Sequence, residues 1–518
     1  MLRCKNKGKE FIWVTAGCIL LTGAVFACFF WGKSSLGKTA NRSEQEIASM
    51  DLESLEGSRI CLANGATTAE DDAVSVEGDV ITITGAGCYE IDGTLTDGQL
   101  VVDAEGADVI LLMDGAAITC NNSAALYVKE AATVTVYTRS GTENSLCSVG
   151  EYEASDEYNI DGAVFARSNI TLLGEGALSV ESEYGHGIAV KGTLEIISGD
   201  YDVVCHEDAL HVKENLTVCG GNIAICAGDD ALHAEEDLLI ADGVIDIEEC
   251  YEGLEGHTIT LDGGDICITA SDDGLNASNP ESDSSSMDPM ASDETCSITI
   301  NGGELYVVAQ GDGIDSNGDI IVTGGNIRIS TMANGADSAI DYSGEAYITG
   351  GTVVACGGSA MAQNFGENST QGSILQCLNE TVEGQVVLYD AGGNELLSYT
   401  PENAYNCVVV SAPEILIGEN YQLEIAGESY DIAMESVIYG MSQGMGFGAL
   451  QKFNGKMSEN LDGERPEMPE GFDGKMPEDF DGERPEMPEG FDGKMPEDFD
   501  GERPEMPEGF DGKMPVDN

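Results

Sequence analysis

Acidic and imidazole side chains recur along the middle of this chain in a short phrase of nearly constant spacing. A copy such as Asp208-Ala209-Leu210-His211 has a polar residue, a small one, an aliphatic one and usually a second polar one. Copies start at residues 186, 208, 230, 252, 273 and 312, so the first intervals are 22, 22, 22 and 21 residues. Carboxylate oxygens repeated in this way are ligands of the kind that Ca²⁺ prefers. The pattern therefore predicts a protein that binds calcium.

The spacing also indicates which elements must hold these side chains. A constant period in the twenties is typical of a solenoid, in which each repeat buries its apolar face against its neighbours. Each repeat has an alternating strand, a Gly-Gly turn such as 220–221, a second strand, and then the acidic phrase. The interval from 273 to 312 is longer because residues 278–294 form an insertion. The predicted fold is all-β, a right-handed parallel β-helix whose register continues through the insertion.

Stacked coils would place the acids in columns about 4.8 Å apart. Like charges at that distance repel one another, and Ca²⁺ between them would offset the repulsion. The alternative is that these acids are solvated turn residues. A second column, two or three residues further on, contains His211 and His233 besides more acids. The predicted metal ligands are Asp208, Asp229, Asp230, Glu252, Glu255, Asp272, Asp273, Asn276, Asp312, Asp315 and Asp341.

A third column is basic at its start and could meet an acidic ligand. It begins with Arg167, Lys191 and Lys213 and continues with Glu235 and His257. The cations either pair with neighbouring acids or contact the carboxylates of a sugar. Both Trp residues lie within 11–32, so any ring stacking on a glycan must use Tyr or Phe. We therefore predict a polysaccharide partner, including uronate polymers, bound by Arg167, Lys191, Lys213, Tyr184, Tyr201 and Tyr251.

The charge and the N-terminus bound the partners and the location. The 518 residues include 94 acidic and 22 basic ones, for a net charge of −72. Nucleic-acid binders need basic patches, so we expect no nucleic-acid partner. Residues 11–32 are apolar and uncharged, and basic residues precede them. This predicts a single-pass membrane anchor with residues 33–518 extracellular. A cleaved signal peptide is the alternative.

Composition shifts divide the chain into six predicted parts. The thirteen cysteines from Cys61 to Cys407 are scattered, show no spacing of a zinc site, and are expected to be mostly buried apolar residues. The tail repeats a 19-residue Pro/Glu/Met/Gly unit without apolar periodicity, so it is predicted to be disordered. The parts are a cytoplasmic basic segment (1–10), the anchor (11–32), a linker (33–66), the β-helix (67–378), a small β module that closes the solenoid (379–438) and the tail (439–518).

Several stretches resemble a known family. They are ITITGAGCYEIDGTLTDGQLVVDA (81–104), VILLMDGAAIT (109–119), TRSGTENSL (138–146) and the DALH, DGLN and DGID phrases. Together they resemble the carbohydrate-binding parallel β-helix proteins of clostridial cell surfaces, which are related in fold to calcium-dependent pectate lyases. The resemblance implies binding of cellulose and acidic plant polysaccharides, with calcium between coils. It also implies that Asp229, Asp230 and His233 occupy part of the lyase calcium cluster, with His233 in place of an Asp.

Three functions are compatible with these features. The first is a surface-anchored, calcium-stabilised protein that binds plant or cell-wall polysaccharides. The second is a calcium-dependent polysaccharide lyase, in which Lys213, beside His211, would be the base that removes a proton next to the uronate carboxylate. The third is a structural adhesin without sugar specificity. The sequence favours the first.

Overall fold

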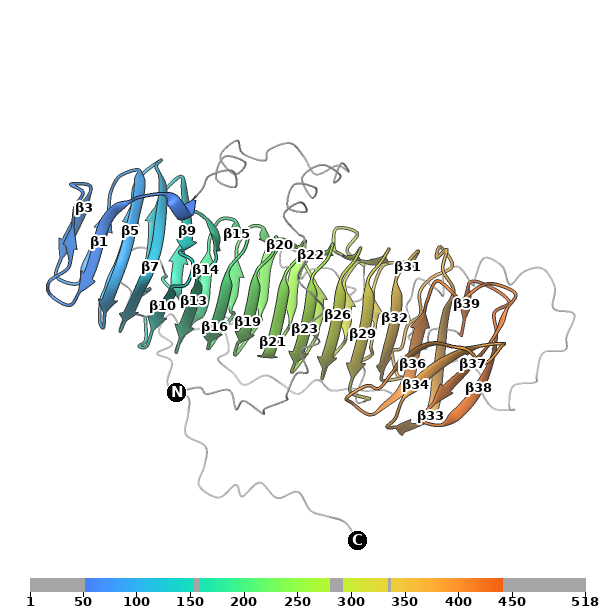
Figure 1. The fold of residues 1–518 in the computed structure, drawn as a ribbon. Helices are drawn as coiled ribbons and strands as arrows, with labels where there is room; N and C mark the ends of the chain where they lie inside the picture. The colour runs from blue at the N-terminus through green and yellow to red at the C-terminus, as the bar shows by residue number, and fades with distance from the viewer. Residues whose placement is uncertain (1–51, 153–158, 280–291, 334–336, 441–518) are drawn as a thin grey trace, which may run out of the picture. The chain divides into compact units, whose positions relative to one another are not determined.

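The computed structural model describes residues 52–152, 159–279, 292–333 and 337–440, and over these ranges it is all-β apart from one 3-10 turn at Leu52–Ser54 (Figure 1). The core of the fold is a β-solenoid of about ten turns. The predicted cytoplasmic segment, the predicted membrane anchor and nearly all of the predicted tail lie outside the described residues. No helix within the described ranges is long and apolar enough to cross a membrane.

The strands form three ladders of parallel pairings, and a typical coil contributes one strand to each ladder. The first ladder contains β4 (Val80–Ile83), β6 (Gln99–Asp103), β8 (Leu126–Glu130), β11 (Gly162–Ala166), β14 (His186–Val190), β17 (Leu210–Val212), the starts of β20 (Leu232–Ile240) and β22 (Leu254–Leu261), β24 (Leu275–Ala277), β27 (Ile314–Ser316) and β30 (Asp341–Tyr342). The second contains the starts of β5 (Gly87–Leu95) and β7 (Asp108–Cys120), then β9 (Thr133–Thr138), β12 (Asn169–Gly174), β15 (Leu194–Ile196), β18 (Leu216–Val218), the ends of β20 and β22, β25 (Ser297–Ile300), β28 (Asp319–Val322) and β31 (Ala346–Ile348). The third contains β1 (Ser58–Ala63), the ends of β5 and β7, β10 (Glu143–Ser148), β13 (Ala177–Ser182), β16 (Asp200–Cys205), β19 (Asn222–Cys226), β21 (Val244–Cys250), β23 (Asp265–Ala270), β26 (Glu304–Ala309), β29 (Asn326–Thr331) and β32 (Thr352–Gly357).

Side chains that point inward stack on their equivalents in the next coil and form one continuous apolar core. Leu210, Leu232 and Leu254 occupy one register position on successive coils, and each is at most 1% exposed. Burying a leucine side chain contributes about 1.5–3 kcal/mol, so these stacked columns are the main source of cohesion between coils. Because strand residues alternate between faces, the neighbours of each buried leucine point outward, where polar side chains can bind a ligand or a metal ion.

Glycines make the corner between the second and third ladders, as predicted. The second residue of the turn has positive φ, 98° at Gly221 and 93° at Gly264. A Cβ atom on Gly221 would lie 2.8 Å from the Gly199 carbonyl oxygen of the preceding coil. Both the backbone conformation and the close approach of coils therefore require glycine here.

The predicted insertion leaves the stack intact. Residues 280–291, within it, lie outside the described residues. On either side of this gap, Asn276 pairs with Asp315 and Ile259 pairs with Ile298 in the parallel register of the other coils. The register therefore continues through the insertion, as the sequence predicts.

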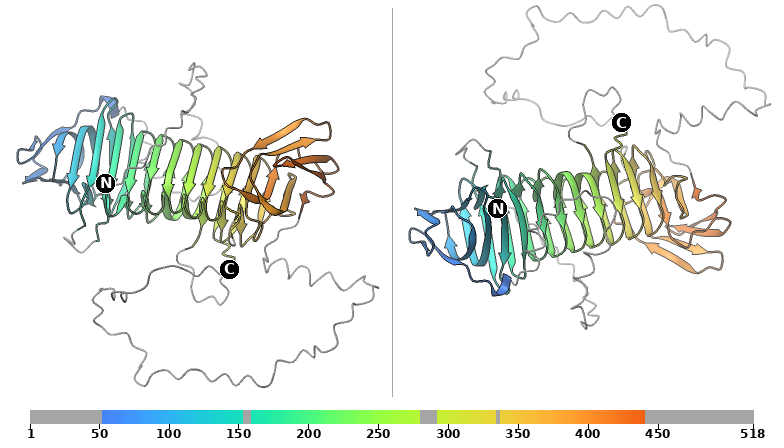
Figure 2. Two further views of the ribbon diagram at one scale, coloured as in Figure 1. Left: turned by 90° about the horizontal axis from the view of Figure 1, so that it is seen from below. Right: turned by 90° about the horizontal axis from the view of Figure 1, so that it is seen from above.

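Antiparallel pairings occur at both ends of the stack. β1 pairs with β2 (Thr68–Ala69), and β3 (Val74–Glu77) pairs with β4. β36 (Tyr405–Ser411) pairs antiparallel with both β32 and β33 (Ser373–Val382), and β39 (Ile438–Tyr439) pairs with β33. A separate antiparallel sheet has the order β35 (Glu395–Tyr399), β34 (Val386–Asp390), β37 (Asn420–Ile425) and β38 (Glu428–Ala433). Both views of Figure 2 show these C-terminal strands beyond the last coils.

One boundary differs from the prediction. Residues 33–66 were expected to be a linker, yet β1 lies within them and pairs in parallel with β5. Ile60 and Leu62 of β1 are 0% and 5% exposed, so this strand adds apolar residues to the core. The linker prediction is therefore wrong for Ser58–Ala63, where buried positions alternate with more exposed ones.

Candidate functional site

The predicted acidic column lies at the corner where each coil passes from the third ladder to the first. Backbone hydrogen bonds join the corners of successive coils. The Ala209 N–H donates to the Asp230 carbonyl at 2.9 Å, and the Ala231 N–H donates to the Glu252 carbonyl at 2.9 Å. The polar residue that begins the repeated phrase stands at each of these corners, and we call this set the corner row. Its members are His186, Asp208, Asp230, Glu252, Asp273 and Asp312.

A second row follows three residues later on the strands of the first ladder, and we call it the strand row. The register pairs each of its members with the next one along the stack. All are half-buried. The strand row is His211, His233, Glu255, Asn276, Asp315 and Asp341. The two stacked columns predicted from the spacing are therefore present in the structure.

The carboxylates of the corner row are held by backbone N–H groups of the following coil. The Asp230 N–H donates to Asp208 Oδ1 at 3.1 Å, and the Glu252 N–H donates to Asp230 Oδ1 at 3.2 Å. The Asp312 N–H donates to Asp273 Oδ1 at 2.6 Å. One oxygen of Asp208, Asp230 and Asp273 is thus fixed by the backbone, which leaves the other oxygen for a second partner.

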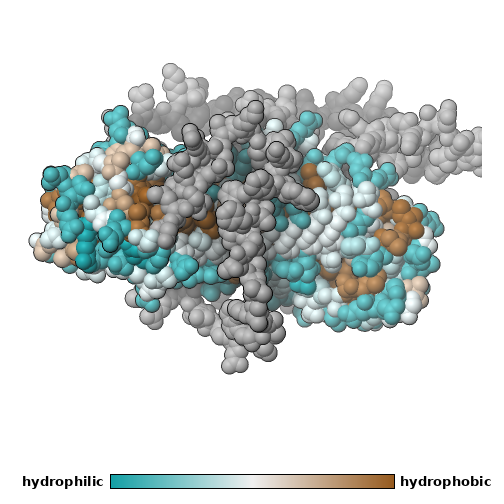
Figure 3. Space-filling view, turned by 45° about the horizontal axis from the view of Figure 1, so that its top comes forward, coloured by the Kyte–Doolittle hydropathy of each residue, from teal (hydrophilic) through white to brown (hydrophobic). Residues whose placement is uncertain are grey.

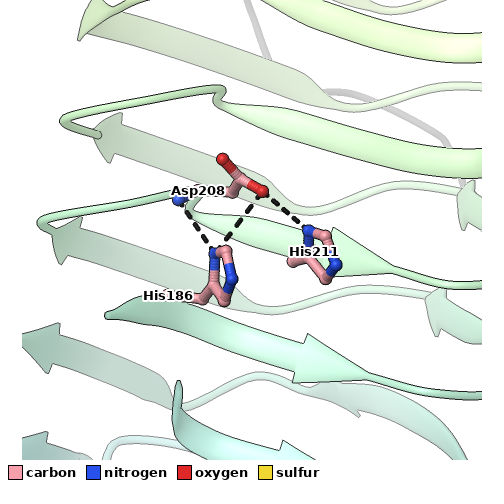
Figure 4. A group of neighbouring side chains, drawn as sticks. All are labelled: His186, Asp208 and His211. Carbon is pink, nitrogen blue, oxygen red and sulfur yellow. Dashed lines mark hydrogen bonds and ion pairs between the residues drawn. The ribbon is translucent and has the colours of Figure 1, made fainter. Parts of the chain in front are cut away.

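Three imidazoles converge on one carboxylate at the N-terminal end of the rows. We call this group, His186, Asp208, His211, Asp230 and His233, the histidine segment. Asp208 Oδ2 lies 2.7 Å from His211 Nδ1, 3.4 Å from His186 Nδ1 and 3.7 Å from His233 Nδ1. Figure 4 shows the His186 and His211 rings both turned toward Asp208, and these rings are stacked with centroids 4.4 Å apart. Burial would raise the Asp208 pKa, but the His211 hydrogen bond and the imidazole charges outweigh it and lower the pKa.

His233 connects the histidine segment to the acids beyond it. Its Nδ1 atom lies 2.7 Å from Glu255 Oε2 and 3.3 Å from Asp230 Oδ2. Burial lowers the His233 pKa, but hydrogen bonds to Asp230 and Glu255 outweigh burial and raise the pKa to about 10. Burial raises the Asp230 pKa, against the His233 hydrogen bond, to about 7. At this point of the rows, the protonated His233 ring balances part of the carboxylate charge.

The C-terminal end of the rows has no such balance. We call Asp273, Asp312, Asp315 and Asp341 the carboxylate segment, and within the described ranges no basic side chain forms an ion pair with any of them. Burial and the charges of neighbouring aspartates raise the pKa of Asp273 to about 6, of Asp315 to about 7 and of Asp312 to about 8. Burial, and to a smaller extent the charge of Asp337, also raise the pKa of Asp341. These carboxylates therefore repel one another when all are ionised.

The two segments offer different metal ligands. Oxygen atoms of Asp273, Asp312 and Asp315 lie within 4.8 Å of one another. Calcium bonds of about 2.3–2.6 Å allow two oxygens on the same ion to be up to about 5 Å apart, so this group fits Ca²⁺. Asp230, Glu252 and Glu255 form a similar group, with burial raising the Glu252 pKa to about 8. Nitrogen donors make the histidine segment a poor match for calcium, which prefers oxygen.

The remaining predicted ligands lie beside these groups. Asp229 and Asp272 each precede a corner-row residue, and the backbone links both to Tyr251: the Tyr251 N–H donates to the Asp229 carbonyl at 2.8 Å, and the Asp272 N–H donates to the Tyr251 carbonyl at 2.9 Å. Asn276 donates its side-chain N–H to Glu252 Oε2 at 2.9 Å. These positions place additional oxygen atoms along the edge of the rows.

Two of the three predicted tyrosines are accessible and one is not. Tyr251 and Tyr184 are 46% and 47% exposed, at the same corner as the rows. A hydrogen bond to Asp272 raises the Tyr251 pKa to about 12. Tyr201 is 4% exposed, points into the core and donates its hydroxyl hydrogen to the Ser198 carbonyl at 2.7 Å. The prediction that Tyr201 contacts sugar is wrong, because it occupies an inward position of β16.

Each predicted basic contact already has a partner within the protein. Lys213 forms an ion pair with Glu235. Lys191 Nζ lies 3.7 Å from Asp161 Oδ2 and 5.4 Å from the centroid of the Phe165 ring. Arg167 donates to the Lys129 carbonyl at 3.3 Å. The register stacks the three cations on successive coils, and each of them contacts a nearby group of the protein.

The sequence analysis did not predict a shallow groove of about 600 Å³ on the outer face of the third ladder. Its floor includes one row of outward side chains on five successive coils, Ser145, Ser179, Asp202, Ala224 and Asp246. Small residues at this register position leave the hollow, and the repeat spacing identifies them as equivalent positions on successive coils.

Figure 3 shows that the visible described surface is mostly hydrophilic, with apolar patches confined to small areas.

A comparison with family models identifies one family. A family model described as "Carbohydrate-binding domain-containing protein" matches residues 77–335 and 233–372, which together span more than half of the chain. A relative with the same description, from Acetivibrio thermocellus, is 32% identical over 149 residues, which is 28% of this chain and 52% of the relative. The chain thus spans about half the length of that relative. A solved structure, described as the polysaccharide lyase-like protein from C. thermocellum in a gadolinium derivative, is 24% identical, covers 57% of this chain and 97% of its own, and has a TM-score of 0.35.

Proposed function

The chain belongs to the carbohydrate-binding domain family, and from that membership we propose that it binds plant or cell-wall polysaccharide on a solenoid stabilised by calcium. The observation that carries the calcium part of the proposal is the carboxylate segment. Four half-buried aspartates stand on three successive coils there, with pKa values raised by burial and by one another. Such an arrangement is costly for the protein alone and favourable around a cation.

The aspartates at three positions would hold the ion. Asp273, Asp312 and Asp315 each supply one oxygen, and Asp272 and Asp341 stand next to them. A bound Ca²⁺ neutralises these charges and offers a cation to an anionic ligand. Because the three aspartates come from two coils on either side of the insertion, binding would also tie those coils together.

The polysaccharide that fits this corner best is acidic. The chain carries a net charge of −72, so a uronate polymer is repelled unless cations stand between the two. Exposed Tyr184 and Tyr251 lie at the same corner and offer ring faces to a sugar. The groove on the third ladder has carboxylates and no basic residue in its lining, so we assign uronate binding to the corner.

We further propose that residues 11–32 anchor the protein in the membrane, with residues 33–518 outside the cell. This part of the proposal rests on the apolar run and the basic residues before it. It would place the solenoid at the cell surface, where polysaccharide is encountered.

Thermal unfolding of the full-length chain tests the proposal. Melting is compared in EDTA and in calcium, each with and without polygalacturonate, and a neutral glucan serves as the control polymer. A ligand at a hundredfold excess over its dissociation constant stabilises the folded state by about 2.7 kcal/mol. We expect calcium to raise the melting temperature and polygalacturonate to raise it further only when calcium is present. No calcium shift would refute the metal site, and a calcium shift without any polysaccharide shift would leave a structural adhesin as the better description.

A further inference from the structure

The histidine segment has the donor set of a transition-metal site. Three Nδ1 atoms, from His186, His211 and His233, surround the single oxygen Asp208 Oδ2 at 3.4, 2.7 and 3.7 Å. The residues come from three successive coils, β14, β17 and β20. From this convergence we propose that His186, Asp208 and His211, whose ligand atoms all lie within 4.8 Å of one another, together bind one divalent transition-metal ion of the zinc class.

The distances match the size of such a site. Zinc bonds to nitrogen and oxygen are about 2.0–2.2 Å, so two ligand atoms on a tetrahedral ion lie about 3.3 Å apart. The separations of Asp208 Oδ2 from His186 Nδ1 and His211 Nδ1, 3.4 and 2.7 Å, lie on either side of that value, so small shifts would bring these three atoms onto one ion. Imidazole nitrogens with one carboxylate suit zinc, copper or nickel, whereas calcium takes oxygen. The site therefore differs in chemistry from the one proposed for the carboxylate segment.

His186 is already oriented as a metal ligand. Its Nδ1 atom accepts a hydrogen bond from the Asp208 N–H at 3.1 Å, so the lone pair on Nδ1 is directed at the corner. Its Nε2 atom lies 3.2 Å from Glu207 Oε2. A carboxylate behind the second ring nitrogen fixes the tautomer of a metal-binding histidine and is a usual feature of such sites.

Direct metal binding tests the inference, which does not rest on the proposed binding of polysaccharide. The full-length chain is stripped with a chelator and dialysed, and ZnCl₂ is then titrated in excess calcium. We expect one zinc ion per chain in the wild type and loss of that ion in the double variant His186→Gln/His211→Gln. His257→Gln is the matched control, because His257 bonds to Thr295 Oγ1 outside the rows and should leave zinc binding unchanged.

Three further measurements support the test, and the first of them guards against a folding defect. The calcium-dependent rise in melting temperature should persist in His186→Gln/His211→Gln if that variant is folded. Cobalt(II) added to the wild type should give the visible absorption of a tetrahedral nitrogen and oxygen site. Glu207→Gln should weaken zinc binding by about 10- to 100-fold, because it removes the carboxylate behind His186. The inference is overturned if the wild type binds no zinc, if a folded double variant binds zinc as tightly as the wild type, or if cobalt gives an octahedral spectrum.

Discussion

The histidine segment and the carboxylate segment occupy the same two rows of one solenoid, yet they differ in how their charge is balanced. In the first, imidazoles surround Asp208, and the Asp208 pKa is lowered despite burial. In the second, the aspartates form no ion pair with a basic side chain of the described residues, and burial together with the charges of neighbouring aspartates raises the pKa of Asp312 to about 8. The backbone register is the same in both.

Under the two proposals above, the repeat supplies equivalent backbone positions, and the side chains at these positions determine which metal ion fits. A coil that carries His at the strand row offers nitrogen donors, and a coil that carries Asp there offers oxygen donors. Since the backbone is equivalent, exchanging these residues should exchange the metal preference. The predictions below test that statement, beginning with the largest expected effect.

Removing two carboxylates should abolish the calcium effect and spare the zinc site. In Asp312→Asn/Asp315→Asn we expect the calcium stabilisation of about 2.7 kcal/mol at a hundredfold excess to disappear. In EDTA at pH 8 the variant should melt above the wild type, because two repelling charges are gone. Calorimetric melting measures both effects. Asp265→Asn is the control, since Asp265 is exposed at the start of β23, and the comparison fails if both variants behave alike.

Converting the histidine segment should give it the preference of the carboxylate segment. In His211→Asp/His233→Asp we expect zinc binding to be lost and one additional calcium ion to bind per chain. The reason is that both strand-row nitrogens are replaced by oxygen donors beside Asp208 and Asp230. Equilibrium dialysis with each metal gives the stoichiometry. Calcium stoichiometry that remains at the wild-type value would contradict the equivalence of the two segments.

The carboxylate segment should make the metal-free protein less stable as pH rises. Asp273, Asp315 and Asp312 have pKa values near 6, 7 and 8 when folded, whereas an unfolded aspartate has a pKa of about 3.9. The folded state thus binds more protons at these three groups across this interval, so the stability that they contribute is fully present below pH 4 and is lost as pH rises through about 8. Melting in EDTA between pH 4 and pH 8 measures the slope. Calcium should flatten it, and a rise in EDTA stability over this range would show that other groups dominate.

The exposed tyrosines should matter for the ligand and the buried one for stability. Tyr251→Ala should weaken polygalacturonate binding by about 2- to 10-fold, the equivalent of the 0.5–1.5 kcal/mol of one aromatic contact. Tyr201→Phe should leave binding unchanged and cost about 1 kcal/mol of unfolding free energy, because the hydrogen bond to Ser198 is lost. Affinity electrophoresis and melting measure the two effects. Equal binding by Tyr251→Ala and the wild type would move the sugar site away from this corner.

The smallest expected signal is lyase activity. Lys213, the candidate base, is ion-paired with Glu235 on the next coil, and we expect no unsaturated product from polygalacturonate in calcium. Absorbance of the product double bond is the measurement. Formation of product by the wild type, and its loss in Lys213→Ala, would instead identify a calcium-dependent lyase.

Much of the site could be predicted because the repeat period alone fixes which residues stack. Once Asp208 and Asp230 are separated by one coil, the positions of His211 and His233 follow, and the structure confirms this stacking. The 17-residue insertion does not change the register of the rows, because it enters between strands. What the period does not reveal is the direction of a single side chain or its partner. Tyr201 shares the inward face of β16 with Val203 and Cys205, and this alternation can be read from the sequence. The Lys213–Glu235 pair depends on side-chain rotamers that spacing does not encode.

The antiparallel strands at the two ends of the stack limit the end-to-end association of one chain with another. A parallel solenoid has no internal reason to stop, because each coil presents the same row of backbone donors and acceptors to the next. Here β36 covers β32, and β2 covers β1. A chain shortened before β33 would expose the β32 edge, and such chains should associate end to end into fibres. The C-terminal strands therefore act against self-assembly, and they leave the corner rows on the side of the stack accessible to ligands.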